Sequence, residues 1–99
     1  MSIPSFNITY KETDDGTELI VDDLKGFYNA LLSFVVNGYY TKFETTLFCE
    51  FIDKDGNIYK SDVDEYNLDK TLDKCLDYFE RAEEYEKCIT IKKMINERL

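Results

Sequence analysis

The chain has 99 residues, of which 43% are hydrophobic and 15% aromatic, so it has the apolar content of a folded domain rather than of a disordered segment. Its 21 acidic and 12 basic side chains give a formal net charge of −9 at pH 7. That charge disfavours direct binding to nucleic acid or to an anionic membrane, because both interactions need clustered basic side chains.

Residues 1–62 are expected to form a ββαββ arrangement. Apolar and polar side chains alternate over residues 6–11, which is typical of a half-buried strand. Turn-forming residues follow at 13–16, and a return strand is predicted over 18–21. This part of the chain therefore begins with a β-hairpin.

An amphipathic helix is predicted from about residue 23 to residue 37. Asp22 and Asp23 are suitable N-cap residues, and Asn37-Gly38 is a C-cap signal. The apolar residues recur at the helical period, at Leu24, Phe27, Tyr28, Leu31, Leu32, Val35 and Val36. A helix with so wide an apolar face needs cover, and a sheet face is the simplest.

A second hairpin is predicted over residues 43–60, with its turn at 53–56. One alternating set is expected to face the helix, namely Phe43, Thr45, Leu47, Cys49 and Phe51. Two hairpins flanking one helix predict a small antiparallel sheet with the helix across one face.

Residues 51–62 also resemble a calcium-binding EF-hand loop. The first position is Phe51 rather than an acid, and the last is Asp62 rather than the bidentate glutamate that such loops use. The segment is therefore predicted to be a hairpin turn without a metal ion.

Residues 63–99 contain neither glycine nor proline and are predicted to be helical. Apolar residues recur at helical spacing over 68–79 and again over 85–99. Because 81–84 hold no helix breaker, the pattern allows either a helical hairpin or one helix of about thirty residues; we favour the hairpin, since so long a helix is unusual in a globular domain. A single long helix would instead favour a homodimer.

The fold class is thus α+β: two antiparallel β-hairpins with one amphipathic helix across the sheet, followed by a C-terminal helical hairpin. The whole chain is expected to be a single domain, with a ββαββ-like part over residues 1–62 and a helical part over 63–99.

Acidic residues form a stripe along the predicted helical part. Its members, spaced by three or four residues, are Asp69, Asp73, Asp77, Glu80 and Glu84. Residues 61–86 carry ten acids and three bases, whereas 87–99 carry four bases and one acid. Such a row is either a solvated helix face or an imitation of the phosphates of a nucleic acid.

Residues 84–95 resemble the second helix of a UVR-type motif, a helical hairpin found in excision-repair proteins and in some Clp-ATPase-associated and kinase-activator proteins. The matching positions are Tyr85, Ile91, Lys92 and Ile95. The departures are Cys88 and Ile89, where two alanines are usual, and Lys93, where the family has aspartate. The resemblance implies that residues 68–99 mediate protein–protein contact and have no catalysis of their own.

No catalytic, cofactor-binding or metal-binding residue is predicted. Without histidine the chain has no Ser-His-Asp triad, Cys-His pair or imidazole metal site. Cys49, Cys75 and Cys88 are far apart in the sequence and form no C-x-x-C pair, which is typical of buried thiols in a reducing cytoplasm. The residue usage is typical of an AT-rich genome, such as that of many phages.

We therefore expect a small cytoplasmic, non-enzymatic interaction protein that binds and modulates a larger partner protein, one with a basic cleft. The residues expected to bind it are Asp69, Asp73, Asp77, Tyr78, Glu80, Glu84 and Tyr85. The alternative is a nucleic-acid-mimicking inhibitor of a DNA- or RNA-handling enzyme, such as a host defence nuclease.

Overall fold

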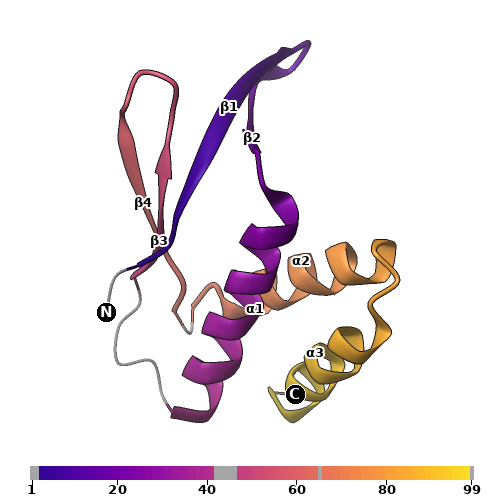
Figure 1. Cartoon of the computed structure of the whole chain (residues 1–99). Coiled ribbons are helices and arrows are strands. Elements are labelled where there is room, and N and C mark those ends of the chain that lie inside the picture. Colours follow the sequence, from indigo (N-terminus) through magenta and orange to yellow (C-terminus); the bar gives the residue numbers. More distant parts are fainter. Residues whose placement is uncertain (1–2, 42–46, 65, 99) are drawn as a thin grey trace. The chain divides into compact units, whose positions relative to one another are not determined.

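The computed structural model describes residues 3–41, 47–64 and 66–98 (Figure 1). The chain forms two compact units, Met1–Asp62 and Val63–Leu99. The first unit holds four strands and one helix, and the second holds two helices. The expected α+β class is confirmed.

The first unit is built on one mixed four-stranded sheet. Strand β1 (Ser5–Thr13) pairs antiparallel with β2 (Gly16–Val21), and β3 (Leu47–Ile52) pairs antiparallel with β4 (Ile58–Asp62), so both predicted hairpins are confirmed. The two hairpins are joined by a parallel pairing of β1 with β3, which gives the strand order β2-β1-β3-β4. The expectation of a purely antiparallel sheet was wrong because the helix between β2 and β3 returns the chain to the end of the sheet where β1 begins.

Helix α1 (Leu24–Thr41) begins as predicted but ends later. The Asp23 carboxylate accepts a hydrogen bond of 3.0 Å from the N–H of Gly26, which caps the first turn. The helix continues through Asn37-Gly38, and Gly38 is buried within it, so the predicted C-cap was wrong. A glycine inside a helix costs only about 1 kcal/mol relative to alanine, so the continuing helix outweighs this stop signal.

Aromatic rings hold α1 on the sheet. The ring centroid of Phe27 lies 5.4 Å from that of Phe6 and 5.8 Å from those of both Phe48 and Phe51. The predicted helix-facing set omitted Phe48, because strict alternation puts positions 48 and 51 on opposite faces. An irregularity between Leu47 and Cys49 breaks that alternation, and both rings reach the helix. The predicted positions Phe43 and Thr45 lie outside the described residues, as does Glu44.

The turn of the second hairpin is organised by Asp53, whose residue surface is only 8% exposed. Its carboxylate accepts hydrogen bonds from the backbone N–H groups of Asp55 and Asn57, both at 2.9 Å. It also accepts from the Asn57 side-chain amide at 3.0 Å and from the Tyr59 hydroxyl at 3.4 Å. The side-chain bond from Asn57 is the largest cause of a lowered pKa at Asp53. The EF-hand-like segment thus folds as the predicted hairpin turn.

The second unit is a helical hairpin of α2 (Leu68–Arg81) and α3 (Tyr85–Arg98), as predicted. The chain reverses after Ala82 because Glu83 adopts a left-handed backbone conformation with φ of 60°. The N–H of Glu83 then donates to the Glu80 carbonyl at 3.1 Å, and the N–H of Glu84 donates to the Phe79 carbonyl at 3.0 Å. This is the Schellman arrangement that ends many helices, here with glutamate where glycine is usual.

Both helices bury one side. The buried apolar residues are Leu68, Leu72, Cys75 and Phe79 in α2, and Cys88, Ile91 and Met94 in α3. They follow the two apolar stripes of the sequence.

Candidate functional site

The acidic stripe lies along one exposed side of α2. Asp69, Asp73, Asp77 and Glu80 are all exposed, and they span twelve residues, or about 16 Å of helix. The carboxylates are turned away from the buried side of the helix. They can therefore meet an approaching partner without any change in the fold.

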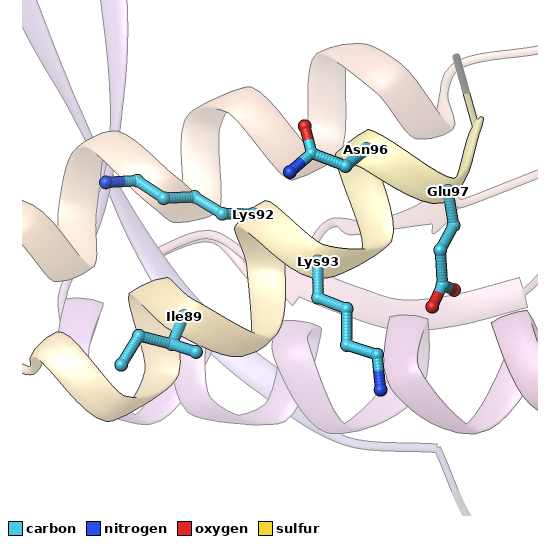
Figure 2. A pocket seen from close by; sticks show the side chains of 5 residues that line it. All are labelled: Ile89, Lys92, Lys93, Asn96 and Glu97. Carbon is cyan, nitrogen blue, oxygen red and sulfur yellow. The ribbon is translucent and has the colours of Figure 1, made fainter.

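The outer side of α3 is less polar. Tyr85 is 62% exposed and Ile89 is 68% exposed, although both are large apolar residues. Ile89 is one of five residues that line a shallow hollow of about 470 Å³, and all five come from α3 (Figure 2). The other four are Lys92, Lys93, Asn96 and Glu97.

Ion pairs compensate much of the stripe. At least three of its five acids have a basic partner. The oxygen–nitrogen distances are 3.3 Å for Asp77–Arg81, 3.9 Å for Glu80–Lys92 and 2.8 Å for Glu84–Lys87. Exposed pairs of this kind contribute little to stability. They do make the surface one of mixed charge.

The Glu80–Lys92 pair also shows how the two helices present their outer surfaces. Lys92 lies on α3, seven residues after Tyr85, so these two side chains share one side of that helix. The pair brings this side of α3 next to the acidic side of α2. The second unit therefore has one continuous surface with acids on α2 and apolar and basic groups on α3.

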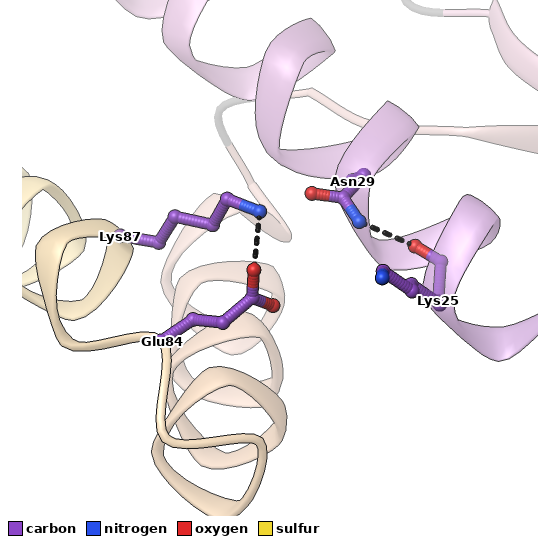
Figure 3. A network of polar contacts seen from close by, with 4 residues as sticks. All are labelled: Lys25, Asn29, Glu84 and Lys87. Atoms are coloured by element: carbon purple, nitrogen blue, oxygen red, sulfur yellow. Dashed lines mark hydrogen bonds and ion pairs between the residues drawn. The ribbon is translucent and has the colours of Figure 1, made fainter.

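Glu84 lies at the tip of the hairpin and has a structural role there (Figure 3). Its carboxylate holds the Lys87 ammonium, which also lies 5.1 Å from the centre of the Phe79 ring. Figure 3 also shows a contact internal to α1, in which the side-chain amide of Asn29 donates to the Lys25 carbonyl at 2.9 Å. With its side chain one-third exposed, Glu84 is the least accessible member of the stripe.

Tyr78 does not lie with the stripe. It follows Asp77 directly, so it is turned about 100° from that carboxylate around the helix. It is half-buried, and its ring centroid lies 5.1 Å from that of Phe79. The structure thus brings together six of the seven predicted binding residues in the second unit and places Tyr78 on the other flank of α2.

Two exposed residues were missing from the predicted site. Tyr66, just before α2, is 99% exposed, and Ile89 is 68% exposed. The spacing of Ile89 contains a signal, because it lies four residues after Tyr85 and outside the buried series Cys88, Ile91 and Met94. Tyr66 belongs to no periodic stripe, and its exposure became evident only from the fold.

The buried titratable groups are not poised for chemistry. Burial raises the pKa of Cys49 to about 11, with a smaller contribution from Glu50, and burial raises the pKa of Cys75 to about 12. Reactive thiols need the opposite shift. Hydrogen bonds lower the pKa of Asp53, whereas a general acid needs a raised one. The pKa shifts of Cys49, Cys75 and Asp53 are thus opposite to those that a reactive thiol or a general acid needs.

Comparisons of the chain with protein-family models, with curated proteins and with solved structures found no match. The resemblance of residues 84–95 to a UVR-type helix stays a prediction. Among the described residues, no helix is long and apolar enough to cross a membrane, and no three potential metal ligands gather at one place.

Proposed function

We propose that this chain is a small, non-enzymatic interaction module of the cytoplasm, encoded by a phage, that binds and modulates a larger protein through its C-terminal helices. One observation carries the proposal. The outer side of α2 presents a row of exposed acids, and Tyr66, with 99% of its surface exposed, lies three residues before the first of these acids in the sequence.

The proposed mechanism has two steps. Carboxylates along about 16 Å of helix attract a basic patch of the partner and orient it during the encounter. Burial of Tyr66 then supplies contact area and one hydroxyl for a hydrogen bond, which is why tyrosine is common at interface centres. Charge would thus govern the rate of association, and the aromatic contact would govern the lifetime of the complex.

The competing function is mimicry of a nucleic acid, which needs a continuous row of uncompensated negative charge. At least three stripe acids have a basic partner, at 3.3, 3.9 and 2.8 Å. This mixed charge supports docking of a protein surface over substitution for a phosphate backbone.

The experiment is affinity capture from the native host, followed by measurement of the captured complex. The test variant carries Asp69→Lys, Asp73→Lys and Asp77→Lys. The control variant carries three equivalent reversals at exposed positions of the first unit, Asp14→Lys, Asp15→Lys and Glu18→Lys. The two variants have the same net charge, so only the position of the change differs between them.

The proposal expects one stoichiometric partner, lost by the α2 variant and kept by the control. A Tyr66→Ala variant should dissociate from that partner at least tenfold faster. Binding should weaken only modestly between 50 and 200 mM salt, whereas a phosphate mimic, whose affinity rests on charge, would lose affinity steeply over that range. A partner that the α2 variant retains would refute the proposal.

A further inference from the structure

The outer side of α3 carries an apolar surface, which lies beside the acids of α2. Tyr85 and Ile89 lie four residues apart on this side, and each is more than 60% exposed. Ile89 stands at one end of the shallow hollow that continues along the helix (Figure 2). Adjacent exposed apolar side chains, rather than single ones, mark a contact surface, and Tyr85 and Ile89 are neighbours on this side of the helix.

The charges beside Ile89 are arranged in a particular order. Glu86 precedes it by three residues and Lys93 follows it by four. Around the helix axis, Glu86 is offset from Ile89 by about 60° and Lys93 by about 40°, both in the same direction. Both charges therefore lie on the same flank of Ile89. Along the helix axis they lie about 5 Å before it and about 6 Å after it. Glu97 lies on the same flank about 12 Å beyond Ile89. Within about 6 Å of Ile89, the flank is therefore acidic on one side and basic on the other.

We propose that a second copy of this chain packs on this face, with the two α3 helices antiparallel and crossing near Ile89. Like flanks meet in an antiparallel pair related by a two-fold axis. Glu86 of each copy then faces Lys93 of the other, and this contact occurs twice. On the opposite flank, Lys92 of one copy lies beside the Tyr85 ring of the other, the partners of a cation–π contact.

The charges also select the orientation. In a parallel pair related by a two-fold axis opposite flanks would meet, so Lys93 of each copy would lie at nearly the same height as Lys92 of the other, and the two ammonium groups would repel each other. The antiparallel pair replaces these repulsions with two attractions between Glu86 and Lys93. The face is thus complementary to itself in one direction only.

The contact is small. Helix α3 has 14 residues, which corresponds to about 21 Å of length. A single pair of such helices buries less area than a standard stable interface, so we expect a dissociation constant of about 10–100 µM. Of the acids on α2, Glu80 lies beside this contact through its ion pair with Lys92. The inference does not depend on the proposed function.

Sedimentation equilibrium of the full chain from about 5 µM to 1 mM tests the inference. The wild type should change from monomer to dimer within this range. Glu86→Lys and Lys93→Glu should each weaken the dimer at least tenfold, and the double variant should restore it to within about threefold. An equimolar mixture of the two single variants should form a heterodimer, because positions 86 and 93 are then both basic in one copy and both acidic in the other.

Ile89→Asp should abolish the dimer, and the matched control is Ile58→Asp, at another isoleucine that is 58% exposed. Helical circular dichroism confirms that each variant is folded. A wild type that stays monomeric at 1 mM would overturn the inference. So would a dimer that tolerates Ile89→Asp, or single charge variants that associate as strongly as the wild type.

Discussion

A substitution at the end of α2 tests whether the left-handed conformation of Glu83 reduces the stability of this protein. Glu83 occupies the left-handed position of the Schellman turn, with φ of 60°, and the backbone bonds at 3.1 and 3.0 Å hold it there. A side chain with a Cβ atom pays about 1–2 kcal/mol for this conformation, whereas glycine adopts it freely. We therefore expect Glu83→Gly to stabilise the protein.

The size of the effect follows from two opposing contributions. Glycine removes the left-handed penalty, but it also gives the unfolded chain more freedom, which costs about 0.4–1 kcal/mol. The substitution also removes an acid from the C-terminal end of a helix, where the carbonyl dipoles repel negative charge, and this adds a few tenths of a kcal/mol. The net gain should be about 0.5–1 kcal/mol, or about 3–6 °C in melting temperature.

Urea and thermal unfolding followed by helical circular dichroism measure this gain. Glu83→Ala isolates the charge, because it removes the carboxylate and keeps the Cβ atom. Ala82→Gly is the matched backbone control: Ala82 has φ of −80°, so glycine there should destabilise by about 0.5–1 kcal/mol. Equal stability of Glu83→Gly and Glu83→Ala would refute the backbone explanation.

Three further predictions concern the interior. Because the pKa of Asp53 is lowered on folding, its stabilisation is present above about pH 4 and is lost as pH falls through the folded value; Asp53→Ala should lower the melting temperature at pH 7, and the difference from wild type should shrink progressively as the pH falls below 4. The thiols of Cys49 and Cys75 should resist a thiol reagent at pH 8 until the protein unfolds, and rapid native labelling would contradict their burial. Leu72→Ala, at a fully buried position, should cost about 2–5 kcal/mol in urea unfolding, against less than 1 kcal/mol for the half-exposed Leu19→Ala.

Local patterns were sufficient to predict most elements of this fold. The alternation over residues 6–11 and the helical spacing over 68–79 both identified the right structure, since each reports which side of an element is buried. The parallel pairing of β1 and β3 could not be predicted from such patterns. It joins segments more than forty residues apart, and neither strand contains a signal for the other.

Three details of the fold could not be predicted from residue type, because each depends on the surrounding structure. Leu47, Phe48 and Cys49 are all apolar, so no alternation could locate the irregularity among them. Glu83 takes a left-handed backbone conformation, which could have been predicted only if the residue there were glycine or asparagine. The exposure of Tyr66 depends on what packs nearby, because an aromatic residue is normally assigned to the core.

The charges of α3 connect the stability of the helix with its proposed self-association. Glu86 lies in the first turn, where the helix dipole favours an acid. A helix with an acid early and bases late is for the same reason complementary to an antiparallel copy of itself. Glu86→Lys should therefore lower both helix stability and dimer affinity. In the double variant with Lys93→Glu, the contacts between copies are restored but the unfavourable dipole contact remains. Dimer affinity should then recover while the stability of the monomer stays a few tenths of a kcal/mol below wild type. Full recovery of monomer stability in the double variant would refute the dipole contribution.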